Sequence, residues 1–288
     1  MVRTYGMLVR TLATCLLFIL FTNLVYSQSS EIGLGLGVSG YKGDLNKSLY
    51  KPKNLNLAGA ILFRHSFNSH WSYRLNFNIG TIEADDADSN DDFANSRNLS
   101  FKSNITELHL GLEFNFFPFQ TAKLVSSSWT PFLFAGIAGY RFNPKAEYNG
   151  DWYELQPLNT EGQGLEQYND RKPYKRLQMS IPFGGGFKFR LGHRWGLVLE
   201  SGARRTFTDY LDDVSTTYVD PALLLSANGA LSAILSDRSD IVDKTLNINR
   251  QRGNASDKDW YMFTHVTLSF TLSKKYNDNC LPFGTKLK

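Results

Sequence analysis

Cysteine, proline and long apolar runs are scarce in this sequence. Its 288 residues include 2 Cys and 9 Pro, with 42% hydrophobic and 20% charged residues. So few cysteines exclude a disulfide-stapled secreted peptide, and that much hydrophobic content excludes a disordered polymer. The mean hydropathy is −0.29, and only one segment is apolar enough to cross a bilayer as a helix, which excludes a polytopic helical membrane protein. Aromatic residues are abundant, at 14%.

The single apolar segment lies at the N-terminus. Arg3 and Arg10 precede an apolar run over residues 12–26, and small residues follow at cleavage-site spacing. This pattern predicts a secretory signal peptide over residues 1–27, cleaved from the mature chain. A lipidated Cys15 is the alternative, which the continuation of the apolar run beyond that residue disfavours.

The mature chain has a nearly even charge balance. Removing residues 1–27 takes away two arginines and no acid, so the net charge falls from +4 to +2. Such a balance gives no electrostatic footprint for nucleic acid. Cys280 becomes the only cysteine, so no internal disulfide can form.

Beyond the signal segment, apolar residues alternate with small or polar ones at period two. On a strand this period places successive side chains on opposite faces. The fourth run changes phase between Ile105 and Leu108, which predicts a β-bulge. The eight alternating runs cover residues 32–38, 55–67, 71–79, 99–116, 132–142, 177–191, 195–199 and 260–272.

These runs favour a membrane-spanning barrel over a soluble sandwich. The longer ones reach ten residues or more, which suits a tilted strand that crosses a bilayer. A sandwich would have a polar outer face, whereas here the minor face carries Gly, Asn, Arg and Lys and is typical of a barrel interior. We therefore predict an all-β fold, an eight-stranded antiparallel up-and-down transmembrane β-barrel over residues 28–272.

The connections between the runs alternate in length, which predicts short periplasmic turns and long extracellular loops. Aromatic residues near the strand ends predict interfacial girdles, with Trp71, Trp129 and Trp195 on the short-turn side and Phe142 and Tyr174 on the loop side. The long connections cover about residues 42–54, 84–98, 144–172 and 208–258.

The last long connection contains its own apolar helix. Apolar residues fall at helical spacing over residues 221–236, with Asp220 as N-cap and Pro221 at the first helical position. A loop of this length is usually functional. Two interpretations stay open: a partner-binding or lid element, and a helix that folds onto its own loops.

Eight strands enclose an interior only wide enough for side chains. We therefore expect a plugged lumen filled by paired charges. His109 and Glu113 have the residue types of a hydrolase site, but four residues along a strand separate them by about 13 Å. No catalytic or cofactor-binding residue is predicted. The predicted interior polar network consists of Arg74, His109, Glu113, Lys188, Glu200, Arg204 and His265.

An acidic stretch in the second long connection resembles the start of a calcium loop. Asp86, Asp88 and Asn90 have the starting spacing, but Asp91 and Arg97 stand where that loop needs Gly and Glu. A solvated acidic loop is the favoured interpretation, and these three residues are only weak metal candidates.

Longer strings in the loops resemble a known family. Residues 142–158, 160–164 and 204–220 are similar to segments of the PorG-like outer-membrane barrels of Bacteroidetes. Shorter matches support this resemblance across essentially the whole mature chain. These cover residues 43–45, 113–118, 235–239, 252–254 and 259–261.

The resemblance implies a structural, non-enzymatic component of the type IX secretion or gliding machinery. Such a protein would lie in the cell outer membrane among its lipids and contact periplasmic ring proteins, with no cofactor, nucleic acid or small-molecule substrate. A structural or adhesive barrel unrelated to secretion is the alternative, and a lipid-modifying barrel enzyme is disfavoured.

The last residues, 273–288, extend beyond the final run and are predicted to form a periplasmic tail. Lys274, Lys275 and Cys280 are the candidate partner contacts, with a mixed disulfide at Cys280 as one route. A disordered tail is the other interpretation.

Overall fold

The computed structural model describes residues 29–122 and 127–272. The predicted signal peptide and the candidate contacts Lys274, Lys275 and Cys280 lie outside these residues. Among the described residues, no helix has both the length and the apolarity needed to cross a membrane.

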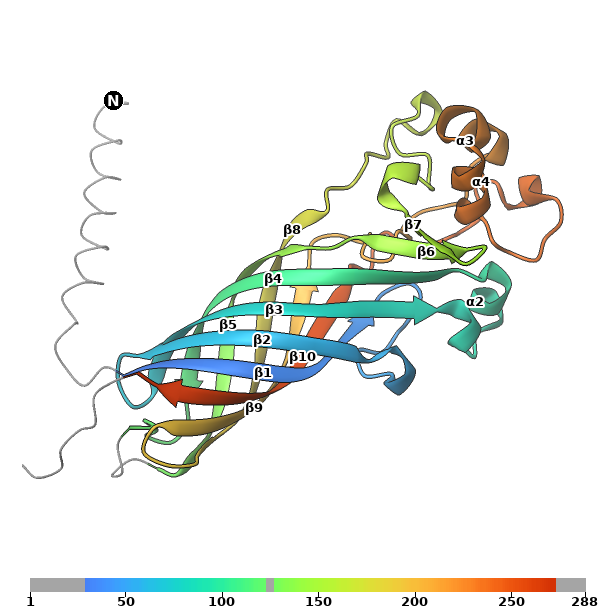
Figure 1. Ribbon diagram of the computed structural model, residues 1–288. Coiled ribbons are helices and arrows are strands. Elements are labelled where there is room, and N and C mark those ends of the chain that lie inside the picture. Colours follow the sequence, from blue (N-terminus) through green and yellow to red (C-terminus); the bar gives the residue numbers. More distant parts are fainter. Residues whose placement is uncertain (1–28, 123–126, 273–288) are drawn as a thin grey trace, which may run out of the picture.

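Eight long antiparallel strands close into a barrel, which confirms the predicted fold class (Figure 1). Each strand pairs with its neighbours in the chain, and closure comes from pairing of the first and last strands, with Glu31 opposite Thr271. The barrel strands are β1 (Ser29–Lys42), β2 (Asn56–Ser66), β3 (Trp71–Asp85), β4 (Ser100–Asn115), β5 (Trp129–Arg141), β8 (Leu177–Arg190), β9 (Trp195–Thr206) and β10 (Trp260–Thr271).

Two further strands form a hairpin that the sequence patterns did not reveal. Strand β6 (Pro144–Tyr148) continues β5 in the same register along β4, since Arg141 lies opposite Thr106 and Lys145 lies opposite Lys102. Strand β7 (Asp151–Glu154) then pairs with β6. The hairpin therefore extends the barrel wall beyond the long-loop end.

Short helices fill the remaining long connections. The predicted helix over residues 221–236 is two helices, because Gly229 adopts a φ of 89° between them. Asp220 caps the first by accepting a hydrogen bond from the Ala222 amide at 2.8 Å. The helices are α2 (Asp92–Arg97), α3 (Pro221–Asn228) and α4 (Ala230–Ser236), with 3₁₀ turns η1 (Pro52–Asn54), η2 (Asp86–Asp88), η3 (Gln156–Leu158), η4 (Glu166–Tyr168) and η5 (Lys244–Asn247).

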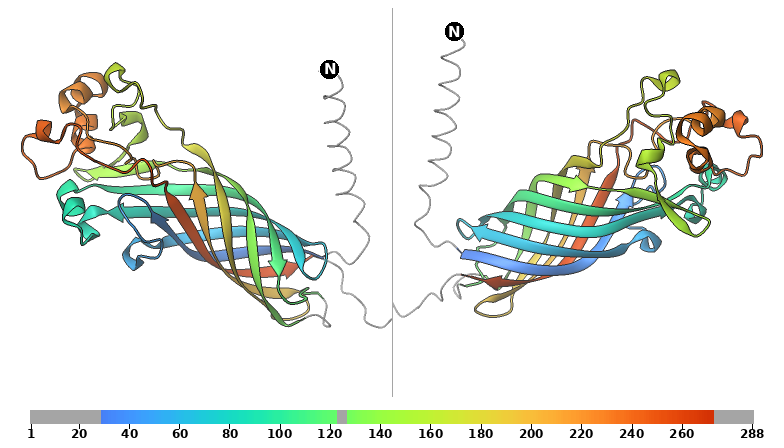
Figure 2. Two further views of the ribbon diagram at one scale, coloured as in Figure 1. Left: turned by 180° about the vertical axis from the view of Figure 1, so that it is seen from behind. Right: turned by 45° about the horizontal axis from the view of Figure 1, so that its top comes forward.

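We call the part beyond the long-loop end of the barrel the cap, made of residues 43–55, 86–99, 142–176 and 207–259. Figure 2 shows that α3 and α4 stand in the cap, at the opposite end of the barrel from the short turns. The start of β1 and the end of β10 both lie at the short-turn end of the barrel.

The outside of the barrel carries an exposed apolar belt. Large side chains such as Leu36 and Leu57 are 78% and 87% exposed, and they alternate with buried inward residues. An apolar surface of this extent is unfavourable in water and matches the lipid-facing band of transmembrane barrels. The belt therefore marks the part of the barrel wall that crosses the membrane.

The prediction of a bulge in β4 is wrong. The change in the apolar pattern comes from a reversal of polarity between the two faces of the strand. Strand β4 pairs with β3 in one unbroken register from Phe114 to Ser100, and its burial alternates without a slip. Phe101 and Ile105 point inward, whereas Leu108 points outward. The strand keeps its phase while the apolar face moves from the outside to the inside. This change marks where the strand leaves the lipid and enters the cap.

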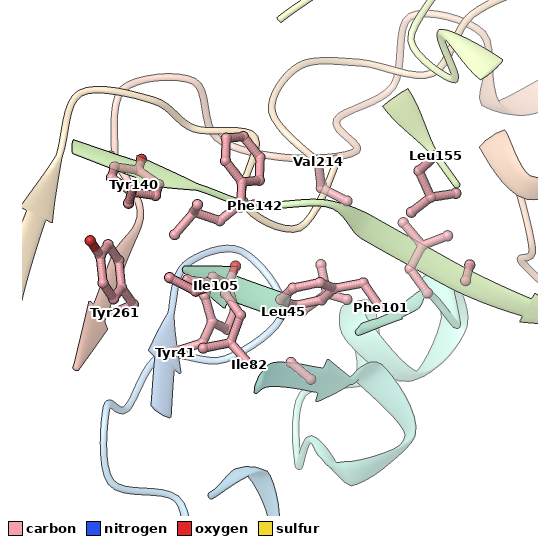
Figure 3. Packing of buried hydrophobic residues seen from close by; sticks show 14 of the residues in the cluster. Tyr41, Leu45, Ile82, Phe101, Ile105, Tyr140, Phe142, Leu155, Val214 and Tyr261 are labelled. Carbon is pink, nitrogen blue, oxygen red and sulfur yellow. The ribbon is translucent and has the colours of Figure 1, made fainter. Parts of the chain in front are cut away.

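The same reversal occurs on neighbouring strands and builds a core at the long-loop end. Figure 3 shows the inward side chains meeting there, with Tyr41 against Phe101 at a ring separation of 4.9 Å. Phe142 and Tyr174 belong to this core, at 0% and 8% exposure, so their assignment to a lipid-facing girdle is wrong. The core includes Tyr41, Ile82, Phe101, Ile105, Tyr140, Phe142, Leu155, Tyr174, Val214, Tyr261 and Phe263.

At the short-turn end the aromatic residues do face outward. Trp71, Trp129 and Trp195 are 43–47% exposed, as an interfacial girdle requires. In β5, however, Phe132 and Phe134 point inward, and Leu133 faces out. The aromatic alternation of β5 therefore belongs to the lumen.

The polarity reversal yields a depth test on β4. Leu110→Lys should lower the free energy of unfolding in lipid vesicles by about 2–4 kcal/mol, since it places a charge in the belt. Asn104→Lys, on the same outward face but above the belt, should change it by less than about 1 kcal/mol. Urea titration of the refolded protein measures both, and equal costs would contradict the assigned boundary.

Candidate functional site

The centre of the lumen is the carboxylate of Glu113, which contacts three cations. Arg64 Nε lies 2.8 Å from Glu113 Oε1, and Arg74 Nη1 lies 3.4 Å from Oε2. The Lys188 ammonium contacts Glu113 Oε1 as well and donates to Asn115 Oδ1 at 2.6 Å. All four charged side chains are almost completely buried.

Two more carboxylates complete the charge balance of this cluster. Glu31 Oε2 lies 3.0 Å from Arg64 Nη1, and Glu200 accepts two bonds from Arg74 Nη2 at 2.7 and 2.8 Å. Three carboxylates thus face three cations. This neutrality is required because an unpaired charge in a dry interior costs several kcal/mol.

Inward phenyl rings of β5 cover the cations. The Arg74 guanidinium lies 4.3 Å from the centre of the Phe134 ring, and the Lys188 ammonium lies 4.6 Å from that of Phe132. A cation over an aromatic face is favourable, most of all where water is excluded. These contacts explain why β5 directs its phenylalanines into the lumen.

A second, smaller ion pair lies nearer the cap. The Glu107 carboxylate accepts from Arg204 Nε and Nη2, both at 3.1 Å, and from Asn78 Nδ2 at 2.6 Å. The Tyr261 hydroxyl donates to it at 2.7 Å. Because these groups are buried as well, side chains fill the lumen at two levels, and it has the character of a core.

All seven residues of the predicted interior network point into the lumen and are buried. Five of them form the ion pairs just described. The other two, His109 and His265, face inward, and neither ring nitrogen of His109 has a hydrogen-bond partner among the described residues. The structure does not join His109 to Glu113, whose oxygens are occupied by cations, so it assembles no hydrolase pair from them.

Sequence reasoning missed three members of the network. Arg64, Glu31 and Glu107 each stand next to an outward apolar residue in the alternation, so the parity of their positions places them inside. The alternation alone therefore assigns all three to the interior, although they stand at the ends or polar positions of the apolar runs.

The cap is held by a second buried ion network, centred on Arg252 and Glu161. Arg252 Nη1 donates to Glu161 Oε1 at 2.9 Å and to the Asp213 carbonyl at 2.7 Å. The Glu161 carboxylate also accepts the backbone amides of Ser215 and Thr216, at 2.9 and 3.1 Å. One ion pair therefore joins three segments that are far apart in sequence.

A third buried pair connects the acidic stretch of the second long connection to this network. Asp86 binds Arg97 through contacts of 2.7 and 2.8 Å, and Arg97 Nη1 donates to the Arg252 carbonyl at 2.6 Å. Asp88 pairs with Lys53 at 2.9 Å. Asn90 is exposed.

The structure therefore gives the weak metal candidates Asp86, Asp88 and Asn90 different surroundings and does not bring them together. Within residues 29–122 and 127–272, no group of three or more acidic, histidine or cysteine side chains is arranged to hold a metal ion.

Acidic side chains also gather where the cap meets the barrel. The Tyr41 hydroxyl donates to Asp212 and lies 3.4 Å from Asp259 Oδ1. Burial, with the neighbouring carboxylates, raises the pKa of Asp212 and of Asp259 well above the usual value. Burial raises the pKa of Asp209 to about 7, and the nearby Asp44 carboxylate adds to this rise.

The lumen cluster predicts a large effect from one isosteric change. Glu113→Gln should lower the free energy of unfolding by about 3 kcal/mol, because it leaves Arg64, Arg74 and Lys188 without their shared counter-charge. Denaturant unfolding in detergent micelles measures this. Glu147→Gln, an exposed position on β6, is the matched control. A Glu113→Gln effect below about 0.5 kcal/mol, as at an ordinary surface site, would contradict the assignment.

The acidic group predicts a pH dependence. The folded Asp209 carboxyl holds its proton more tightly than the unfolded one, so its stabilising contribution is greatest below about pH 4 and is lost as the pH rises to about 7. Asp209→Asn should therefore stabilise the protein by about 1–2 kcal/mol more at pH 8 than at pH 4, where the folded carboxyl keeps its proton. Unfolding followed by intrinsic fluorescence at both pH values tests this, with the exposed Asp257→Asn as control. The same gain at both pH values would refute it.

Solved structures that resemble this chain are outer-membrane barrels, at low similarity. The attachment invasion locus protein Ail of Yersinia pestis has 10% identity and a TM-score of 0.40, over 85% of this chain and 99% of that one. Neisserial surface protein A has 6% identity and a TM-score of 0.41, over 87% and 99%. The N-terminal β-barrel domain of Pseudomonas aeruginosa OprF has 10% identity and a TM-score of 0.35, over 85% and 100%.

At these scores the likeness carries no argument about function. No curated protein matches the chain. A family model described as a domain of unknown function, DUF6089, matches residues 10–222, which is most of the sequence. The chain belongs to the DUF6089 family.

Proposed function

We propose that this protein is a structural barrel of the outer membrane, which acts through contacts at its two ends and transports nothing through its lumen. The observation that carries the proposal is the neutral, buried ion cluster around Glu113. An interior closed by ion pairs offers no path for a solute, and the His109 and Glu113 side chains do not form a catalytic pair.

We infer the orientation from the barrel and from the predicted export signal. The predicted signal peptide directs the chain out of the cytoplasm, and barrels with an apolar belt belong to outer membranes. Short turns then face the periplasm and the cap faces outside. The Leu272 amide, in the last described residue of the chain, donates to the Ser30 carbonyl at the short-turn end, the end that this orientation assigns to the periplasm.

We propose further that the barrel is a component of the type IX secretion or gliding machinery. This rests on the resemblance to PorG-like barrels. In this chain the similar residues 160–164, 204–220 and 252–254 meet at the Arg252 and Glu161 pair of the cap. The periplasmic end would contact ring proteins, through Lys274, Lys275 and Cys280 in the tail.

A second candidate is an adhesive barrel that is independent of secretion. The observation in its favour is the apolar surface of the cap, where Val242 is 98% exposed, Leu246 60% and Leu225 55%. Exposed apolar groups of this kind suit contact with another surface.

Affinity purification from native outer membranes separates the two candidates. A secretion component should recover periplasmic ring proteins, and its deletion should abolish export of the cargo. An adhesive barrel should purify without a ring and leave export normal. If Cys280 forms a mixed disulfide, Cys280→Ser should remove a high-mass band on a non-reducing gel.

The closed lumen is tested separately in planar lipid bilayers. The purified chain should give no steady ion conductance, because eight strands filled by paired charges leave no continuous water path. Stable open-channel currents from the wild-type protein would refute a purely structural barrel.

A further inference from the structure

A basic groove lies on the outer wall of the barrel, beside the β6–β7 hairpin. It has a volume of about 460 Å³, and its lining includes Lys102, Arg141, Lys145 and Trp152. Lys102 and Arg141 are outward positions of β4 and β5. Figure 1 shows β4, β6 and β7 side by side at this place.

The groove begins where the apolar belt ends. Along β4 the outward residues change from Leu108 to Thr106 and then to Lys102. Arg141 of β5 lies opposite Thr106 of β4, which is two residues or about 7 Å along the strand from Leu108. Lys102 is six residues or about 20 Å along β4 from Leu108. Because barrel strands tilt by 35–45°, this range corresponds to about 5 to 15 Å above the belt. That is the height of lipid head groups, and its upper part needs a larger head group than that of a phospholipid.

The charges of the groove are poorly compensated. Lys102 and Lys145 are directly opposite each other in the β4–β6 ladder, and like charges in that position destabilise a sheet. Their acidic neighbours lie at the outer edges: Glu83 is 3.4 Å from Lys102, and Glu154 is 3.8 Å from Lys145.

One of these two acids is shared with a cation outside the groove, and neither pairs with Arg141. Glu154 is closer to Arg176, at 2.7 Å. In the part of the chain that the structure describes, no carboxylate lies within ion-pair distance of Arg141. The three cations of the lining and the adjacent Arg176 therefore share two acids, Glu83 and Glu154, which leaves an excess of two positive charges at and beside the groove.

An aromatic side chain completes the site. Trp152 of β7 is 49% exposed, and the Lys102 ammonium lies 5.8 Å from the centre of its ring. The apolar face of an exposed indole suits the C–H face of a sugar ring, while neighbouring ammonium and guanidinium groups suit phosphate oxygens. Cation and aromatic side chains at the edge of the membrane thus fit a sugar that carries phosphate.

We propose that this groove binds the phosphorylated sugar head group of a glycolipid in the outer leaflet, with Lys102, Arg141 and Lys145 on its phosphates and Trp152 against its sugar. The site lies on the outer wall, apart from the lumen, and it rests on the proposed orientation in which the cap faces outside. It would orient the hairpin on the membrane surface and fix the barrel among anionic lipids.

The test uses the mature chain in phosphatidylcholine nanodiscs, with bis-phosphorylated lipid A as the added probe. A triple variant, Lys102→Gln with Arg141→Gln and Lys145→Gln, should weaken lipid A binding at least about tenfold, since each basic residue near the surface contributes to anionic-lipid binding. It should fold normally, because the substitutions remove a like-charge pair from an exposed surface. Native mass spectrometry counts bound lipid, and heat-dependent gel mobility reports folding.

The matched control is Lys172→Gln with Arg250→Gln and Lys258→Gln, three exposed cap residues away from the lining of the groove. It removes the same net charge and should change binding less than about twofold. Equal losses in the two triple variants would overturn the proposal, as would equal binding of dephosphorylated lipid A. Inorganic phosphate that binds as tightly as lipid A would also overturn it, since the ligand would then be a free anion.

Discussion

The contact on which the rest of this structure depends is that of one carboxylate, Glu113, with three cations inside a barrel that is only wide enough for side chains. Eight strands leave room for side chains alone. Every charge placed inside must therefore find its partner from another strand, and this requirement links the wall of the barrel to its contents. Arg64 and Arg74 bridge Glu113 to Glu31 and Glu200. Removing one partner affects the whole cluster, whereas exchange of an outward leucine for another apolar residue affects little.

The second constraint is the boundary between lipid and water. On β4 the inward face is polar and the outward face apolar below this boundary, and above it the two are exchanged without any change in strand phase. Strand β4 shows both halves, with Glu113 and Leu110 below and Ile105 and Asn104 above. The cap consequently has a conventional apolar core inside a sheet that is continuous with the membrane barrel, and the Arg252 and Glu161 pair joins its loops above that core.

Period-two alternation was enough to predict the number of strands, their order and the inward side of the seven interior residues. It could not predict the β6–β7 hairpin, which has too few residues to show a period, or the division of the loop helix at Gly229. The sequence also concealed the partners. Arg252 and Glu161 are 91 positions apart, and nothing local indicates that they meet. The error at Ile105 had a physical cause, since a rule that apolar residues face outward holds only at membrane depth.

The continuity of β3 and β4 across the membrane boundary has a mechanical consequence. Their ladder runs unbroken from the pair Trp71 and Phe114 to the pair Asp85 and Ser100. Because barrel strands tilt by about 35–45°, the larger component of a pull on the cap along the barrel axis acts along these strands. The ladder hydrogen bonds then share the load in shear, and they do not open one after another as in a peeled hairpin. The wall of the barrel is thus arranged to resist extraction, and force applied to the cap would reach the short turns through the sheet itself.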